Sequence, residues 1–257
     1  MDSYAELNAQ AIDRWVGKGW IWGIPMGPEE FARAKAGDWK VLLTPLKPVP
    51  QEWFLPFLKE GSLKGTRLLG LASGGGQQMP VFSALGAECT VLDYSERQLE
   101  SERLVAQREA YDITLVRADM TKPLPFPDGS FDLIFHPVSN CYIEDVNHVW
   151  RECMRILRSG GVLLAGMGNG VSYLFDDEDP LRVVHKLPYN PLKNPELYKK
   201  SMEDPEDGSI QFSHTLEDQL GGQLRAGLTL RDLYEDFDTE GVGEYYPTFW
   251  ASRAVKP

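Results

Sequence analysis

The sequence predicts an α/β protein in which a mostly parallel sheet carries helices on both faces. Three observations lead to this class. Short apolar runs bounded by turn residues recur through the middle of the chain, helical patterns separate several of them, and a glycine-rich turn follows the first run. Alternation with short links favours right-handed crossovers between parallel strands. We therefore expect a doubly wound sheet.

The apolar runs predict the strands. They are short and rich in Leu, Val, Ile and Phe, which is typical of strands buried on both faces. Five of them lie in the middle of the chain, at residues 66–72, 89–93, 112–117, 131–137 and 161–167. Residues 228–236 and 248–255 predict a closing antiparallel pair near the end of the chain.

The helices between these strands have recognisable ends. After the first strand, apolar residues at three-residue spacing predict a helix closed by Gly86. Ser95 with Gln98 forms a capping box for a second helix that runs to about residue 109. A third helix places an apolar stripe between Val146 and Leu157, and we expect it to stop at the Ser-Gly-Gly that follows.

Composition excludes several classes of function. The 257 residues carry 26 Lys plus Arg against 38 Asp plus Glu, and the net charge of −12 opposes binding to nucleic acid. No stretch approaches the roughly 18 apolar residues of a membrane span, and the start lacks the order of a signal peptide, so we expect a soluble, cytoplasmic protein. The 3 cysteines and 4 histidines show no metal-ligand spacing, so no metal is expected.

Two segments flank or interrupt the alternating region. Residues 1–60 hold five of the 7 tryptophans and predict a helical and aromatic lid, with Ser3 and Glu6 at the start of its helix. Trp20 and Trp22 are candidates for a pocket wall, although these rings also suit a cover over one face of the sheet. Within the main domain, residues 61–257, the proline-rich stretch 169–213 predicts a cap with little regular structure.

The glycine-rich turn and an acid beyond it predict a binding site. Gly74, Gly75 and Gly76 let a ligand approach the main chain, and the N–H groups at the helix start attract an anionic group; a plain tight turn is the alternative. Asp93 ends the second strand, about 20 residues further on, where a carboxylate can accept both hydroxyls of a ribose. The alternative for Asp93 is a cap of the next turn, a place that Ser95 already takes.

Details of the turn decide between nucleotides. In the dinucleotide fingerprint a third glycine lets the helix press on the sheet, but Met79 occupies that place, which disfavours NAD. After the third strand, Asp119 suits a hydrogen bond from an adenine amino group and Met120 suits contact with the ring, although Asp119 is equally compatible with a solvated loop acid.

At these positions the sequence resembles the class I S-adenosylmethionine-dependent methyltransferases, in particular the small-molecule, methyltransferase type 11-like branch. The resemblance covers roughly residues 64–170. It is carried by GLASGGGQQ, TVLDYSERQLE, RADMTKPLPFPDGSFDLIF and RILRSGGVLLAG. It implies a seven-stranded Rossmann-like sheet with an antiparallel closing strand, S-adenosyl-L-methionine as cofactor, and methyl transfer.

The resemblance assigns roles to residues of this chain. The loop would hold the methionine part of the cofactor, Asp93 the ribose, and Asp119 with Met120 the adenine. The positions implied for the cofactor are Ala72, Ser73, Gly74, Gly75, Gln78, Asp93, Tyr94, Asp119, Met120 and His136. Two positions depart from the family pattern: its frequent first-strand acid is Gly70 here, and its first loop glycine is Ala72. Main-chain carbonyls or another segment must then accept from the cofactor's ammonium group.

The acceptor site is expected just after the fourth strand. His136, Ser139, Asn140 and Tyr142 follow that strand, at the sheet edge where open α/β sheets bind ligands. His136 suits a general base or a cofactor contact, and a structural histidine bonded to main chain is an equal alternative. His214 is a further candidate for a covered cleft or a satisfied loop residue. The segment lacks the Asn/Asp-Pro-Pro-aromatic pattern of base methylation.

We therefore expect methyl transfer to a small-molecule acceptor by a monomer or homodimer, with catalysis mainly by positioning. The alternatives are a sensor that binds the cofactor without transferring methyl and, less favoured because of Met79, an NAD-linked oxidoreductase.

Overall fold

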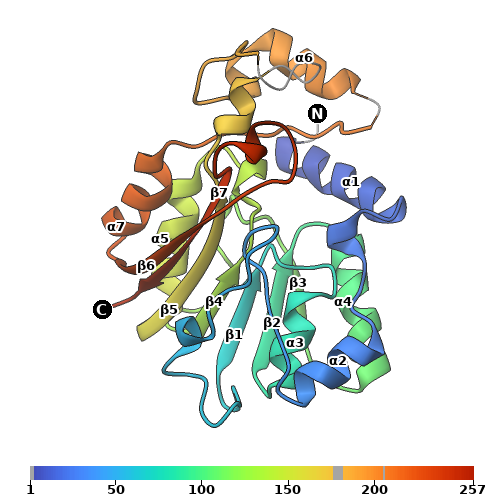
Figure 1. The fold of residues 1–257 in the computed structure, drawn as a ribbon, viewed down its shortest axis with the longest axis vertical. Helices are drawn as coiled ribbons and strands as arrows, with labels where there is room; N and C mark the ends of the chain where they lie inside the picture. Colours follow the sequence, from blue (N-terminus) through green and yellow to red (C-terminus); the bar gives the residue numbers. More distant parts are fainter. Residues whose placement is uncertain (1–2, 176–181, 205) are drawn as a thin grey trace.

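A seven-stranded sheet forms the centre of the molecule (Figure 1), seen in a computed structural model that describes residues 3–175, 182–204 and 206–257. The strand order is β3-β2-β1-β4-β5-β7-β6. The strands are β1 (Arg67–Leu71), β2 (Glu88–Asp93), β3 (Thr114–Arg117), β4 (Phe131–His136), β5 (Leu157–Gly168), β6 (Thr229–Asp236) and β7 (Phe249–Val255). The first five are parallel, whereas β7 runs antiparallel to both β5 and β6. The predicted sheet, with its antiparallel closing pair, is confirmed.

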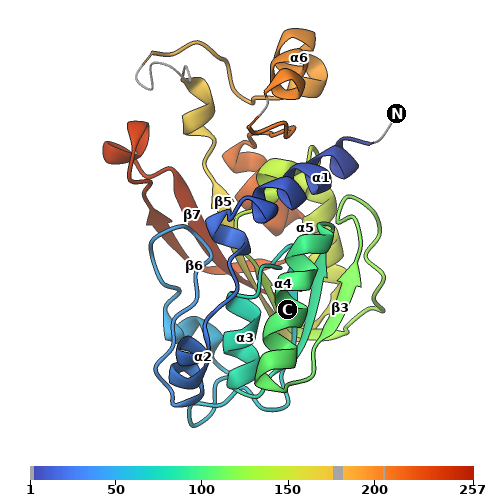
Figure 2. The same ribbon diagram turned by 90° about the vertical axis from the view of Figure 1, so that its right-hand side faces the viewer.

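Helices cover both faces of this sheet (Figures 1 and 2). They are α1 (Tyr4–Gly17), α2 (Pro28–Lys35), α3 (Gln78–Ala84), α4 (Glu96–Glu109), α5 (Val146–Ile156), α6 (Pro195–Glu203) and α7 (Gly222–Arg225). The hydroxyls of Ser3 and Ser95 accept from the main-chain N–H groups of Glu6 and Gln98, so the two predicted helix starts are confirmed. Each cap satisfies an N–H group that has no partner within its helix.

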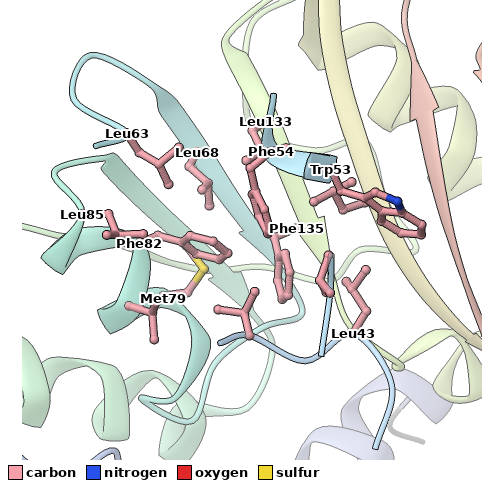
Figure 3. Close-up of a cluster of buried hydrophobic side chains, with 14 of the residues drawn as sticks. Leu43, Trp53, Phe54, Leu63, Leu68, Met79, Phe82, Leu85, Leu133 and Phe135 are labelled. Carbon is pink, nitrogen blue, oxygen red and sulfur yellow. The ribbon is translucent and has the colours of Figure 1, made fainter. Parts of the chain in front are cut away.

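Alternate strand residues divide between two cores. On one face Leu68 and Phe135 pack with Phe82 of α3 and with Phe54, which precedes the sheet in sequence (Figure 3). On the other face the apolar stripe of α5 packs on the sheet, with Trp150 fully buried. A parallel sheet covered in this way leaves the carboxyl ends of its strands as the open edge.

Two predicted elements, the end of the third helix and the cap, differ from the structure. Helix α5 ends at Ile156, before the Ser-Gly-Gly at which we expected it to stop, and β5 begins at the next residue. The strand starts early because Leu157 pairs with Phe131 and Arg158 forms an ion pair with Asp132.

The cap, residues 169–213, contains more regular structure than expected. Helix α6 spans nine residues, with Pro195 in its first turn and the side chain of Asn194 accepting from the N–H of Glu196. Asn at the N-cap and Pro in the first turn are both favoured at a helix start. Positions 176–181 and 205 of this cap lie outside the described residues.

The N-terminal segment has two parts with different neighbours. Helix α1 lies above the carboxyl ends of the strands (Figure 1), whereas Trp39 and Trp53 pack in the core beneath the sheet. Trp39 and Trp53 therefore cover one face of the sheet, which is one of the two uses expected of the N-terminal rings. Within the described ranges, no helix combines the length and apolarity needed to cross a bilayer.

Candidate active site

The first cavity lies at the carboxyl edge of the sheet, where the strand order reverses between β1 and β4. Loops that follow β1, β2, β3 and β4 all contribute to it, together with α1 and the segment 42–45. A reversal of strand order opens a crevice at this edge because the two neighbouring crossovers go to opposite faces. Of the predicted cofactor residues, the cavity is lined by Ala72, Ser73, Gly74, Gln78, Asp93, Tyr94, Asp119 and Met120.

Asp93 is the buried acid of this cavity. One carboxylate oxygen accepts from the N–H of Gly74 at 3.0 Å, and the other accepts from the N–H of Ser95, also at 3.0 Å. Burial raises the pKa of Asp93 to about 6, and the main-chain donors oppose part of that rise. Each oxygen keeps a lone pair, so the carboxylate can still accept hydrogen bonds from a bound ligand.

The glycine turn is shaped by its neighbours. A Cβ atom on Gly74 would lie 2.6 Å from the Cβ of Gln98 and 2.9 Å from a carboxylate oxygen of Asp93. Gly75 does not line the cavity as expected, because it has a φ of +99° and a Cβ there would lie 2.4 Å from the carbonyl oxygen of Trp22. It makes room for the N-terminal segment, so only part of the run faces the ligand space.

Two polar atoms on the cavity wall lack partners. The hydroxyl of Ser73 and the amide oxygen of Gln98 are buried and form no hydrogen bond within the described residues. Leaving such groups unpaired costs about 1–3 kcal/mol each, so a polar ligand that reaches them gains that energy. The donor and acceptor set of the wall therefore fits a cofactor with ribose, adenine and amino-acid groups.

One departure from the family pattern, Gly70, is matched by the side chain of Met79. A Cβ atom on Gly70 would lie 2.6 Å from the sulfur of Met79, which is fully buried. Met79 fills the place where the expected strand acid would stand, so the larger helix residue requires the smaller strand residue. An acidic side chain at position 70 has no room in this packing.

A carboxyl group beneath the turn was not anticipated from the sequence. Glu102 of α4 is fully buried, and one of its oxygens accepts from the N–H of Gly76 at 2.8 Å, while its other oxygen has no partner among the described residues. Burial raises the pKa of Glu102 to about 8. It lies on the buried face of α4, between Leu99 and Val105 at three-residue spacing, but in a mostly polar helix an acid is ordinarily assigned to the surface.

The roof of the first cavity comes from segments distant in sequence. On α1, the small residues Ala5 and Ala9 line the cavity, and Asp13 accepts from Ser95 and from the N–H of Arg97. Leu42 donates its N–H to the side chain of Gln78 at 2.8 Å, which holds the segment 42–45 over the glycine turn. Trp20 and Trp22 line the same cavity.

His136 and Asn140 do not face the cavity as expected. His136 is fully buried, and its ring nitrogens lie 2.8 Å from the carbonyl oxygen of Leu71 and 2.8 Å from the side-chain oxygen of Asn140. Asn140 is also buried and donates to Gln219. Burial lowers the pKa of His136. His136 therefore has the surroundings of a structural histidine bonded to main chain, which was the alternative expectation. Of the four residues expected at the acceptor site, Ser139 and Tyr142 line the cavity.

A second cavity of about 460 Å³ adjoins the first, within the size range of small-molecule sites. The two cavities share Val138, Cys141, Tyr142 and Phe249 as lining residues. The cap contributes much of the remaining wall, and His214 lines this cavity rather than the first. Its aromatic lining comprises Tyr142, Tyr173, Phe175, Tyr189, Phe212 and Phe249. The rim of the sheet therefore carries two adjacent cavities with a common wall.

Metal chemistry has no candidate site in the part of the chain that the structure describes, where no three His, Cys, Asp or Glu side chains are grouped to hold an ion. The cysteines are free, and burial raises the pKa of Cys141, the one that lines both cavities, to about 12. A thiol held protonated in this way is a poor metal ligand and nucleophile.

Comparison with known proteins agrees with this architecture. A family model described as a methyltransferase domain matches residues 69–165. The chain is 40% identical to an uncharacterized methyltransferase of Bacillus subtilis, YbaJ, over 100% of both chains. The chain therefore belongs to the class I S-adenosylmethionine-dependent methyltransferases, and it is an enzyme that uses S-adenosyl-L-methionine.

Solved structures share the fold at low sequence identity. An S-adenosylmethionine-dependent methyltransferase from Mesorhizobium loti is 21% identical with a TM-score of 0.56, and the match covers 80% of this chain and 95% of that one. A geranyl diphosphate C-methyltransferase from Streptomyces coelicolor A3(2), in complex with S-adenosyl-L-homocysteine, is 13% identical with a TM-score of 0.53, covering 80% and 78%.

Proposed function

We propose that this methyltransferase acts on a small-molecule acceptor, with the cofactor in the first cavity and the acceptor in the second. The observation that carries the proposal is the wall that the two cavities share, because it places a second binding space next to the one lined by the predicted cofactor residues. The net charge of −12 opposes a nucleic-acid acceptor.

The chain's own groups are suited to hold the cofactor. Asp93 has a free lone pair on each oxygen for the ribose hydroxyls, and Ser73 and Gln98 offer unpaired polar atoms. Asp119 and Met120 line the side where the family places adenine. Main-chain carbonyls of the turn are the acceptors left for the ammonium group, since Gly70 carries no acid. When bound, S-adenosyl-L-methionine supplies an activated methyl group.

Catalysis is then mainly a matter of alignment. Holding two reactants in line contributes about 7–11 kcal/mol, whereas a general base adds about 10²–10⁴-fold, or roughly 3–5 kcal/mol. Tyr142 and Phe249 stand at the junction where they can orient the acceptor and exclude water. Neither needs to take part in bond making.

Two measurements test the proposal. Thermal unfolding with S-adenosyl-L-methionine, S-adenosyl-L-homocysteine and NAD should show stabilisation by the first two only, because only a bound ligand raises stability by mass action. Incubation of the enzyme and methyl-labelled cofactor with a cell extract, followed by size fractionation, should place the label in the low-mass fraction. Label in protein or nucleic acid would contradict the small-molecule acceptor, and binding without any label transfer would favour a sensor.

A further inference from the structure

The second cavity contains a histidine in a defined protonation state. His214 is 8% exposed, and its Nε2 lies 3.0 Å from the main-chain carbonyl oxygen of Asn140. A carbonyl oxygen only accepts, so Nε2 carries the proton. Burial lowers the pKa of His214, and the main-chain carbonyl groups of Asn140 and Ile143 oppose part of that fall. The neutral ring is therefore favoured near pH 7, and Nδ1 is then the nitrogen that can accept a proton.

The segment that carries His214 is fixed from three sides. The side chain of Asn8 brackets Ile210, donating to its carbonyl oxygen at 2.9 Å and accepting from its N–H at 2.7 Å. Phe212 donates its N–H to the carbonyl oxygen of Cys141 at 2.7 Å. Ser213 donates its N–H to the carbonyl oxygen of Tyr189, at 3.0 Å. A base held in this way needs little reorganisation when a substrate arrives.

A second group in the cavity indicates a ligand with a polar atom. Thr248 lines the cavity, is 4% exposed, and its hydroxyl has no hydrogen-bond partner among the described residues. It is the neighbour of Phe249, which belongs to the wall shared with the first cavity. A buried hydroxyl of this kind is satisfied by a polar atom of a ligand, and its place near the shared wall puts that atom near the reaction centre.

We propose that His214 is the base that removes a proton from the acceptor, and that the acceptor is a phenolic or enolic hydroxyl on a flat ring bound in the second cavity. This inference rests on the proposed function. The aromatic lining suits a flat ring, because rigid rings pack on one another with little loss of entropy. A phenol ionises near pH 10, as tyrosine does, and is within reach of a neutral imidazole. A thiol needs little help from a base, and a neutral amine attacks with its own lone pair. A base in the cavity is therefore most useful to a hydroxyl acceptor.

The proposed step balances as follows. An electron pair of the acceptor oxygen forms the new bond to the methyl carbon, and the pair of the carbon–sulfur bond stays on sulfur. The hydroxyl proton passes to Nδ1 of His214 and from there to solvent. The groups that face the ring are Asp218 and Asp145, which favour its charged form, and the same cavity holds His185, Lys200, Asp204 and Asp207.

The test combines acceptor probes with a variant. The probes are 1-naphthol and catechol, with 1-naphthylamine as the amine partner and naphthalene-2-thiol as the thiol. We expect O-methylated product from the hydroxyl probes, and a fall of 10²- to 10⁴-fold in its rate for His214→Gln, with affinity for S-adenosyl-L-homocysteine kept within about twofold. His148→Gln, a substitution on α5 outside both cavities, is the matched control.

The pH dependence separates a base from a structural residue. In the wild type, the rate should rise with pH through a pKa below 6.5 and then level off. In His214→Gln it should instead rise with pH toward the ionisation of the probe. ¹⁵N NMR of the ligand-free wild type provides a readout that needs no activity: the His214 ring should carry its proton on Nε2 and titrate below 6.5.

Different outcomes would overturn the acceptor class, the role of His214 and the proposed function. Methylation restricted to the amine or thiol probe, or no turnover of any hydroxyl probe by enzyme that binds S-adenosyl-L-homocysteine, would overturn the acceptor class. An unchanged rate and pH profile in His214→Gln, or a ring protonated on Nδ1, would overturn the base. Loss of cofactor binding by the wild type itself would instead contradict the proposed function.

Discussion

The two cavities are built in different ways. The first depends on residues that follow consecutive parallel strands, so that Ser73, Asp93 and Asp119 come from one continuous third of the chain. The second is assembled from the loop after β4, the cap, and the start of β7, which lie far apart in sequence. The difference teaches why a cofactor site can be recognised from its sequence while an acceptor site depends on contacts that only the folded chain brings together.

The largest effect is expected at the first cavity. Asp93→Ala removes both carboxylate oxygens proposed to hold the ribose, each of which contributes a charge-assisted hydrogen bond of about 1.5–3 kcal/mol. Affinity for S-adenosyl-L-homocysteine, measured by calorimetry, should fall at least about 100-fold while the circular dichroism spectrum is kept.

Glu88→Ala, at the opposite, exposed end of the same strand, is the control and should bind as the wild type does. Retained micromolar affinity in Asp93→Ala would contradict the proposal that Asp93 holds the ribose in the first cavity.

The next effect concerns pH. The pKa of Glu102 is raised by burial to about 8, from an ordinary value of 4.5, so the folded state binds its proton more tightly than the unfolded state. Stability from this group is complete below about pH 4.5 and is lost as pH rises toward about 8. Denaturant unfolding should therefore show a wild type that loses more stability than Glu102→Gln between pH 5 and 8.5, by an amount on the order of a few kcal/mol. Parallel curves would contradict the buried acid beneath the turn.

A smaller effect tests the connection between the cavities. Asn8→Ala leaves the main-chain groups of Ile210 and the carbonyl of Tyr142 without their side-chain partner, at a cost of about 2–3 kcal/mol. Hydrogen exchange should accelerate at the amides of Ile210 and Phe212 while the amides of β1 stay protected.

Gln10→Ala, at an exposed position of the same helix, should leave both regions unchanged. Equal acceleration throughout the sheet would mean that Asn8 acts on the whole fold and does not specifically support the second cavity.

The smallest effect concerns an unpaired hydroxyl. Ser73→Ala should weaken cofactor binding by about 3- to 10-fold, since one neutral hydrogen bond is lost, while the ligand-free protein keeps or gains stability. Ser83→Ala removes a buried hydroxyl from a residue that lines neither cavity, and should leave affinity unchanged. A drop in the melting temperature of ligand-free Ser73→Ala would show that this hydroxyl already has a role in the fold.

Much of the fold could be predicted because its patterns are local. Apolar runs buried on both faces identified the central strands, and Ser95 marked a helix start with its own hydrogen bond. The end of α5 was misplaced because the pairing of Leu157 with a distant strand overrides the glycines that follow. Helix α6 was missed because the prolines around it indicated a loop.

The site residues show the same difference between local patterns and contacts made only in the folded chain. Asp93 was recognisable from its distance to the glycine turn, whereas Gln98 and the segment 42–45 carry no pattern that distinguishes them from other polar or loop residues. His136 is the last residue of β4, a place where a ligand-facing residue is expected, but Leu71 and Asn140 occupy both of its ring nitrogens. Whether a histidine meets a carbonyl or a cavity depends on packing between elements, which sequence spacing does not encode.

The bonds of Asn8 have a consequence for the catalytic cycle. Helix α1 covers the first cavity, and the same helix holds the segment of His214 through Ile210. Any departure of α1 that lets the spent cofactor leave must break these bonds and loosen the proposed proton acceptor. The proposed proton acceptor would then be held less firmly whenever α1 is displaced from the first cavity.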